Sequence, residues 1–215
     1  MLAALLLADG RFPMGGHVHS AGMESAVADG RVVDVTTLAA YLDGRLHTTG
    51  LTDAAIAAAA VLHLDQLDEL DAEADARITA PPLRAVSRRL GRQLIRVAGR
   101  CWPSALLASL PDAPHQCVAL GTVGVAAGLQ PADVARLAVH HAVTTPAQAA
   151  VRLLGLDPFS VAALTAGLAA AGEAVVRLAV AAAAGPIAEL PSRTGPVAEI
   201  AAIQHETLPI RLFAS

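Results

Sequence analysis

Two histidines, a serine and a glutamate lie close together near the start of the chain, within a stretch that also holds a proline and three glycines. His17 and His19 form a His-x-His pair, and imidazole nitrogens bind nickel, copper or zinc. Two such ligands without an adjacent carboxylate or thiolate make a weak metal site, and an imidazole packed against glycine-rich backbone is the simpler interpretation. His17, His19 and Glu24 would serve a small metal-dependent hydrolase, which we keep as an alternative. Neighbours such as His19 and Ser20 rarely reach the geometry of a base and a nucleophile.

The same stretch predicts a shaped loop followed by a helix. Pro13 fixes its own φ and lacks an N–H group, and Gly15 can adopt backbone conformations that are closed to other residues. Ser20 is the expected N-cap of a helix that begins at about Ala21. Glu24 is expected near the N3 position of that helix, in a loose capping box.

The composition favours a helical core built from small side chains. Of the 215 residues 54% are apolar but only 2% are aromatic, so Ala, Leu and Val must fill the interior. A chain of this length can bury a sizeable core, and alanine is the strongest helix former. We therefore expect an all-α fold, a single-domain helical bundle over residues 1–215 with a flexible C-terminal tail. The net charge of −4 gives no general attraction for nucleic acid.

Several enzyme classes lack their motifs here. The sequence has no GxxxxGK[ST] nucleotide loop, no GxGxxG, no HExxH and no cysteine cluster for zinc. Cys101 and Cys117 do not form a CxxC pair, and two thiols in a chain of this size are typical of a reduced, cytoplasmic protein. The apolar segment 161–184 has the composition of a membrane span but contains Glu173 and Arg177, so we expect a helix buried in the domain or in a partner.

Apolar spacing and Gly or Pro punctuation predict ten helices. The third is expected to end at Gly50, and Thr52 or Asp53 is expected to cap the fourth. The expected ranges are Leu2–Leu7, Ala21–Asp29, Val35–His47, 52–64, Asp65–Ala76, Pro82–Trp102, Gln116–Leu129, Pro131–Leu154, Asp157–Ala184 and Pro196–Gln204.

The long helix after Pro82 carries a slowly winding stripe of arginines, because residues four apart drift only about 40° around a helix. The stripe consists of Arg84, Arg88, Arg92, Arg96 and Arg100, with Arg89 beside it. A solvated face is the simpler interpretation, and a docking face for an acidic partner is the alternative. An arginine that acts on a partner's nucleotide phosphates would come from Arg84, Arg88 or Arg92.

Residues spread over nearly the whole chain resemble the UreF family of urease accessory proteins. The most specific are the pattern Pro13-x-Gly15-x-x-x-His19-Ser20-x-Gly22-x-Glu24 and the ending Arg211-Leu212-Phe213-x-Ser215. Further matches are Leu7-Ala-Asp, Gly30 followed by Val32 or Val33, Tyr41-Leu42, Asp53-Ala, Ser87-x-x-x-Gly91-Arg92 and Pro114. His17 stands where the family usually has Phe, so either Phe12 fills that apolar role or the loop packs differently.

The resemblance implies an all-α protein of about ten helices that is not an enzyme and has no catalytic residue, metal or cofactor of its own. UreF-like proteins join a UreD (UreH)-type scaffold and a UreG-type GTPase to deliver nickel to apo-urease. The resemblance further implies a cytoplasmic homodimer, GTP bound by the partner, and nickel that passes through the complex by an internal passage. The tail 205–215 would become ordered on binding. The implied partner-binding residues are Pro13, Gly15, His19, Ser20, Gly22, Glu24, Arg92, Arg211, Leu212, Phe213 and Ser215.

Two other function classes stay open beside this one. The hydrolase would hold a stoichiometric metal that His19→Ala removes. A structural helical protein that only forms oligomers would have no urease genes beside its own gene.

Overall fold

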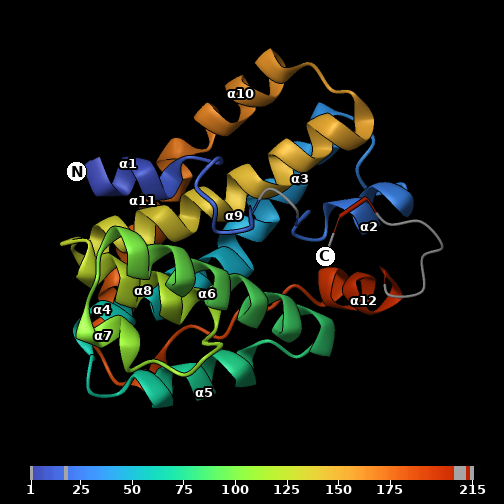
Figure 1. Cartoon of the computed structure of the whole chain (residues 1–215). Helices are drawn as coiled ribbons and strands as arrows, with labels where there is room; N and C mark the ends of the chain where they lie inside the picture. Colours follow the sequence, from blue (N-terminus) through green and yellow to red (C-terminus); the bar gives the residue numbers. More distant parts are fainter. Residues whose placement is uncertain (1, 17–18, 206–211, 214–215) are drawn as a thin grey trace.

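The computed structural model describes residues 2–16, 19–205 and 212–213, and this part of the chain is helical with no β-strand (Figure 1). The expectation of an all-α fold is confirmed. A π-helical turn spans Leu46–Gly50 and a short 3₁₀ turn spans Ile187–Glu189. The α-helices are α1 (Leu2–Ala8), α2 (Met23–Ala28), α3 (Val35–Arg45), α4 (Leu51–Leu62), α5 (Leu67–Arg77), α6 (Pro81–Cys101), α7 (Ala105–Ala108), α8 (Gln116–Ala126), α9 (Pro131–Leu154), α10 (Pro158–Gly167), α11 (Ala169–Ala183) and α12 (Pro196–His205).

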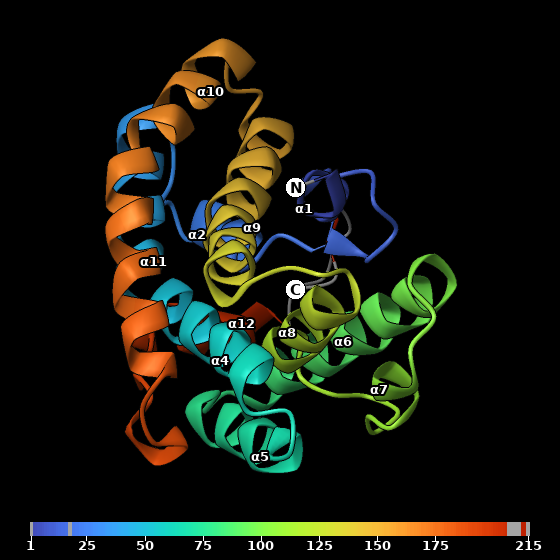
Figure 2. The same ribbon diagram turned by 90° about the vertical axis from the view of Figure 1, so that its left-hand side faces the viewer.

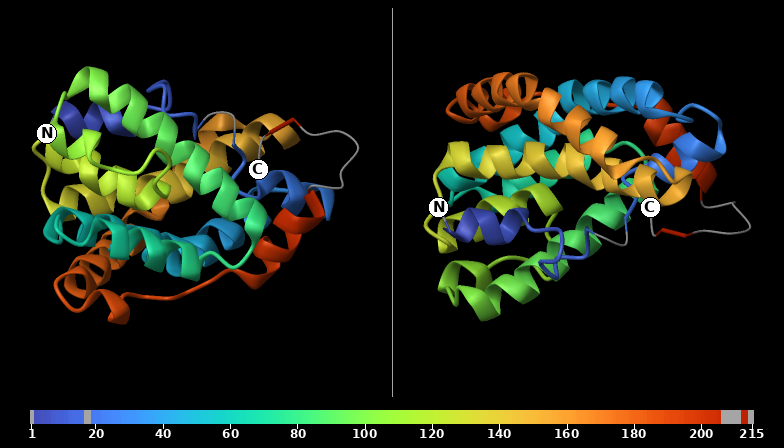
Figure 3. Two further views of the ribbon diagram at one scale, coloured as in Figure 1. Left: turned by 60° about the horizontal axis from the view of Figure 1, so that its bottom comes forward. Right: turned by 90° about the horizontal axis from the view of Figure 1, so that it is seen from above.

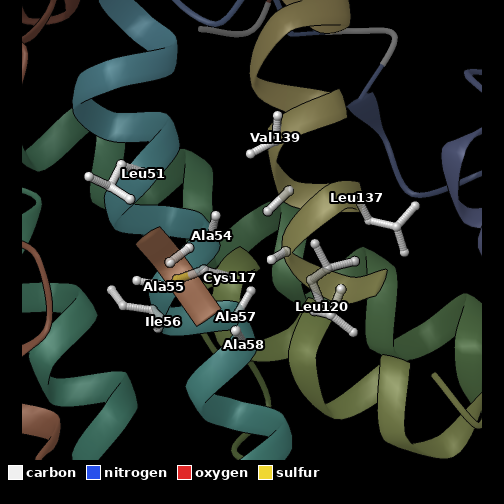
Figure 4. Close-up of a cluster of buried hydrophobic side chains, with 14 of the residues drawn as sticks. Leu51, Ala54, Ala55, Ile56, Ala57, Ala58, Cys117, Leu120, Leu137 and Val139 are labelled. Carbon is white, nitrogen blue, oxygen red and sulfur yellow. The ribbon is translucent and has the colours of Figure 1, made fainter. Parts of the chain in front are cut away.

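Helix α4 lies inside the bundle, with α8, α9 and α11 packed around it (Figure 2). Every residue from Ala54 to Ala60 is buried. Because these side chains are small, the neighbouring helices approach closely. A Cβ added to Gly121 of α8 would overlap the carbonyl oxygen of Ala57 and the side chain of Ala60. Figure 4 shows side chains of α4, α8 and α9 meeting in this buried cluster.

The two longest helices begin and end close to where the sequence places them. Helix α6 starts at Pro81, and α9 starts at Pro131; proline suits the first turn because it has no N–H to leave unpaired there. Helix α9 ends before Gly155, whose φ of 65° is the left-handed conformation of a helix C-cap. Strong apolar periodicity and proline and glycine signals agree in these helices, and the predicted bounds hold.

The predicted break between the third and fourth helices is wrong. Helix α3 continues through the π-helical turn directly into α4. Gly50 has a helical φ of −61°, and a Cβ on it would lie 3.0 Å from the Arg45 carbonyl oxygen in the π-helical turn and 3.4 Å from Ala142 Cβ of α9. This glycine therefore permits a close helix contact and does not end a helix. Thr52 and Asp53 lie inside the continuous helical run, where they cannot act as N-caps.

The single helix predicted over residues 157–184 is also wrong, because the structure has two helices there. Helices α10 and α11 are bent by 45° at the junction that follows Gly167, and glycine is a weak helix former. Helix α11 packs against α4 and α9, whereas Val161 is the only buried residue of α10. Among the described residues, no single helix is long and apolar enough to cross a membrane; α10 and α11 reach that threshold only together, as a bent pair.

The C-terminal part of the chain packs against α2, near the start of the sequence, on one side of the bundle. Helix α12 lies against α2 and α6 (Figures 1 and 3). Ser25 Oγ of α2 donates a hydrogen bond to the Ala201 carbonyl of α12 at 3.2 Å, across 176 positions of sequence. Leu212 and Phe213 then return to α2, the helix that follows the N-terminal loop.

Candidate partner-binding site

The buried carboxylate of Glu24 joins the start of α2 to the end of the chain. Its Oε2 lies 2.8 Å from His205 Nε2 and accepts the Phe213 N–H at 3.1 Å, and its Oε1 accepts the Leu212 N–H at 2.6 Å. A carboxylate is an acceptor only, so the His205 hydrogen lies on Nε2. Glu24 is 7% exposed and His205 is 3% exposed. Buried charged groups need such partners, and all three partners of Glu24 lie between residues 205 and 213. We call Glu24, His205, Leu212 and Phe213 the Glu24 junction.

The capping box predicted for α2 is wrong, and its two residues have other surroundings. Ser20 Oγ has no hydrogen-bond partner among the described residues. Helix α2 begins only after Ala21 and Gly22, which have φ of 52° and 84°. Two successive left-handed residues turn the chain before the helix starts, and the Tyr41 hydroxyl holds this turn by donating to the Ala21 carbonyl at 2.8 Å. The turn leaves Glu24 facing the tail and not the amides of its own helix.

The glycine-rich loop lies along α6. Phe12 packs near Trp102, with ring centroids 6.1 Å apart. The Pro13 carbonyl accepts a hydrogen bond from Gln93 Nε2 at 3.1 Å. Gly15 has a φ of 88°, which favours glycine, and a Cβ there would lie 3.3 Å from a leucine side chain of α6. The loop is therefore held against α6 and Trp102 by one tilted aromatic contact, one hydrogen bond and one close approach.

Within the predicted tail 205–215, the described residues are His205, which ends α12, and Leu212 and Phe213, which have opposite exposures. Phe213 is buried, and the Arg152 guanidinium lies 4.7 Å from the centroid of its ring, in a cation–π contact. Leu212 is 74% exposed. The predicted partner-binding residues Arg211 and Ser215 lie outside the described residues. Phe213 thus anchors the tail within the chain, whereas the side chain of Leu212 is exposed and accessible to a partner.

A cavity of about 180 Å³ lies between the glycine-rich loop, α4, α6, α8 and α9. Its polar lining includes His19, Arg45, Asp53, Gln116, His141 and Thr145. Burial raises the pKa of Asp53 to about 6, against the opposing charge of Arg45. Burial likewise lowers the pKa of His141 to about 4, helped by the neighbouring His140. His141 Nε2 lies 2.9 Å from the Leu7 carbonyl oxygen, which the neutral imidazole reaches as a donor.

The sequence candidates for metal binding are only partly described. His17 lies outside the described residues, and His19 is buried at the cavity wall. In residues 2–16, 19–205 and 212–213, no three His, Cys, Asp or Glu side chains are placed to hold a metal ion. Cys101 is exposed and Cys117 is buried, and burial raises the pKa of the Cys117 thiol. Glu24, the acid of the alternative hydrolase, is occupied by the Glu24 junction.

A second polar cluster joins α5, α6 and α8. His115 is fully buried, with Nδ1 3.0 Å from Ser87 Oγ and Nε2 3.0 Å from Asp75 Oδ1. Ser87 Oγ also accepts the Gln116 N–H at 3.1 Å, and a Cβ on Gly91 would overlap the carbonyl oxygen of the residue before His115. Burial lowers the pKa of His115, whereas its hydrogen bond lowers that of Asp75. Ser87, His115 and Asp75 are linked in the order of a catalytic triad. The Ser87 hydroxyl, however, accepts a backbone N–H at the start of α8, so we assign these three residues a role in packing.

The arginines of α6 divide into two groups. Arg88 donates to Asp71 and Asp75 at 2.9 and 2.7 Å. Arg84 donates to two backbone carbonyls just before α6. Both are partly buried and engaged within the chain, whereas Arg92 is exposed. Of the three arginines considered for action on a partner's phosphates, only Arg92 is exposed.

Two residues of the site were not selected from the sequence, namely His205 and Arg152. His205 is 181 positions from Glu24, and no local pattern connects the two. A weaker signal exists within α12, because Ala201, Ala202 and His205 share one helical face and all three are buried. A histidine on the apolar face of a short helix could have marked a buried polar partner.

Comparison with known proteins agrees with these observations. The UreF family model matches residues 32–169. The chain is 46% identical to the urease accessory protein UreF of Mycobacterium sp. (strain JLS) over 211 residues, 98% of this chain and 97% of that protein. It is 43% identical to that of Mycolicibacterium vanbaalenii over 98% of this chain and 97% of that protein. It is 47% identical to that of Mycobacterium tuberculosis (strain H37Ra) over 76% of this chain and 78% of that protein. The chain therefore belongs to the UreF family of urease accessory proteins.

Proposed function

We propose that this chain is an adaptor that bridges a UreD/UreH-type scaffold and a UreG-type GTPase during nickel insertion into apo-urease. On this proposal the chain supplies a binding surface and no catalytic group, and GTP is bound by the partner. The adaptor works in the cytoplasm as a homodimer within the complex. Its family membership supports the role in urease maturation, and the arrangement of its two ends supports the bridging role.

The Glu24 junction is the observation that carries this proposal. The Pro/Gly/His/Ser/Gly/Glu pattern and the Arg-Leu-Phe ending are far apart in sequence, yet Glu24 binds the Leu212 and Phe213 amides directly. A partner that contacts the tail therefore also reaches the N-terminal loop. The tail 205–215 would complete its ordering on the partner, with Phe213 as the fixed point.

Exposed apolar side chains near both ends of the chain support the proposal that it works bound to other proteins. On α12, Val197, Ile200 and Ile203 are exposed at three-residue spacing and so share a face. On α1, Leu2 and Leu5 are largely exposed as well. Contiguous apolar surface of this kind is typical of proteins that bury it against other proteins.

The cavity is our proposal for part of the route that nickel takes through the complex. Asp53 offers a carboxyl oxygen and His19 and His141 offer imidazole nitrogens at its wall, and these are donors that nickel accepts. The route would pass nickel as cargo, from one donor to the next, without a resident site.

The tail provides the direct test. Removal of residues 211–215 should abolish co-elution with a UreD-type protein in size-exclusion chromatography, because Phe213 and its neighbours are lost. The far-ultraviolet circular dichroism should stay helical, because Leu212 and Phe213 belong to no helix and Phe213 is only one member of a large buried cluster. A truncated chain that still bound the UreD-type protein at full strength would contradict the proposal. A stoichiometric metal in the purified chain that His19→Ala removes would favour the hydrolase instead.

A further inference from the structure

Helix α6, from its middle to its C-terminal end, presents four exposed arginines that have no carboxylate partner within the described chain. We call Arg89, Arg92, Arg96 and Arg100 the arginine face. All four are exposed, and none has an ion pair or hydrogen bond with a described residue. With about 100° between successive residues and 1.5 Å rise, they fall within an arc of about 80° and along about 16 Å of the helix.

Two arginines in the first half of the same helix have partners within the chain. Arg88 bridges Asp71 and Asp75, and Arg84 is bound by backbone carbonyls and lies 3.8 Å from Asp75. Acidic side chains of α5 therefore neutralise the arginines at the N-terminal end of the stripe. The arginines toward its C-terminal end are left without an acidic partner among the described residues. Like charges three and four apart on a helix repel each other, so the arginine face carries a repulsion that an acidic surface would remove.

The surroundings of the arginine face also favour a binding role. Gln93 lies between its members and donates to the Pro13 carbonyl, so the glycine-rich loop runs along the flank of the face. Phe12 and Trp102 pack together near its far end. A partner on the arginine face would thus touch the loop as well, in line with the choice of Arg92, Pro13 and Gly15 as partner-binding residues.

The charges and the composition favour protein over nucleic acid as the occupant. The chain has a net charge of −4, and only 2% of its residues are aromatic, whereas single-strand binders combine basic grooves with stacking aromatics. All fifteen basic residues are arginine, and the guanidinium fork matches carboxylates and phosphates in bidentate pairs, so the negative net charge and the scarcity of aromatic residues decide for carboxylates. We propose that the arginine face and the adjoining loop edge dock a carboxylate-rich surface of a protein in the urease maturation complex.

This inference rests on the proposed function for its set of partners, and the test separates the two. Full-length chains carrying Arg92→Gln and Arg96→Gln are compared with wild type for binding to purified UreD-type protein, UreG-type GTPase and apo-urease. The control carries Arg136→Gln and Arg177→Gln, which remove the same charge from exposed positions of α9 and α11. Circular dichroism and thermal unfolding should be alike for the two variants, because all four positions are exposed and the ion pairs that Arg136 makes with Asp133 and Glu173 lie on the surface, where such pairs contribute little to stability.

The expected result is a loss of affinity for at least one partner of about tenfold or more at ~50 mM salt, which shrinks to about threefold or less at ~500 mM. The control should stay within about threefold of wild type at both salt concentrations. If wild type binds a partner and the arginine-face variant binds all partners as the control does, the arginine face is not a docking surface, and the proposed function stands. If wild type binds none of the three, the proposed function itself fails and this inference falls with it.

A nucleic-acid arm completes the test. A labelled 20-base-pair DNA duplex should show no saturable binding to the full-length chain below ~1 μM at physiological salt. Saturable binding in that range that Arg92→Gln and Arg96→Gln abolish would overturn the assignment to a protein partner.

Discussion

The buried cluster around α4 and the Glu24 junction hold the chain together in different ways. Around α4, stability comes from many small side chains in close contact, with a run from Ala54 to Ala60 that is entirely buried. At the Glu24 junction, one carboxylate holds His205 and two tail amides by three hydrogen bonds. The stability of the cluster around α4 is distributed over many apolar contacts. The position of the tail at the Glu24 junction depends on one side chain.

This difference teaches where a change of sequence separates folding from binding. Close packing tolerates little added volume but depends on no single polar group. A buried polar junction fails when its central acceptor is lost, because the donors around it are left unsatisfied. We therefore expect changes around α4 to act on the whole fold, and changes at Glu24 to act mainly on the tail and its partner.

The largest effect should come from Gly121→Ala in α8. The added methyl would overlap the Ala57 carbonyl and the Ala60 side chain, so the free energy of unfolding should fall by about 3 kcal/mol or more. The matched control is Gly44→Ala in α3, an exposed helical glycine with open space around it. That change should raise stability by roughly 0.5–1 kcal/mol. Urea unfolding of both variants measures the contrast, and equal effects would mean that the helices do not approach as closely as described.

A smaller effect on stability, but a sharper one on the tail, should follow Glu24→Gln. The amide turns one acceptor into a donor that faces the N–H groups of Leu212, Phe213 and His205, at a cost of roughly 1–3 kcal/mol. Hydrogen exchange should show faster exchange at the Leu212 and Phe213 amides than in wild type. The exposed Glu189→Gln is the control and should leave both amides protected. Unchanged exchange in Glu24→Gln would show that the carboxylate does not hold the tail.

The smallest effect should be the pH dependence contributed by Asp53. Its folded pKa of about 6 lies above the ordinary value of 3.8, so the folded chain holds this proton more tightly than the unfolded chain. Stability is therefore lost as pH rises from about 4 to about 6. Asp53→Asn removes this loss and should stabilise the chain by about 1–2 kcal/mol at pH 7.5 and not at pH 4. Thermal unfolding at both pH values measures the effect, with the exposed Asp65→Asn as control.

The same Asp53 variant bears on the proposed nickel route. Asp53→Asn should leave complex formation intact and lower the nickel content of urease matured in its presence. Full nickel loading of urease with this variant would show that Asp53 is not part of the nickel route, whatever the effect of the change on stability.

Much of the fold could be predicted because it follows from local periodicity and punctuation. The bounds of α9 follow from Pro131 and Gly155, and α6 follows from its apolar spacing. The run through Gly50 could not be predicted in the same way, because a glycine after a helix usually ends it. Here the glycine is used for contact with Ala142, which belongs to a helix far along the chain.

Only some residues of the candidate site could be selected from the sequence, and the contacts between them could not be predicted. Glu24, Leu212 and Phe213 could each be selected, but their mutual contact depends on tertiary structure that no local pattern reports. The assignment of Ser20 and Glu24 to a capping box followed a sound local rule. It failed because the left-handed turn at Ala21 and Gly22 delays the helix.

The most direct test of the central claim, that Glu24 acts on the partner through the tail, is a double-mutant cycle of binding. The affinity for a UreD-type protein is measured for wild type, Glu24→Gln, the chain lacking residues 211–215, and the combination of both changes. We predict that each single change weakens binding and that Glu24→Gln has no further effect, within about twofold, once the tail is absent. Additive losses, or a Glu24→Gln chain that binds like wild type, would contradict the claim.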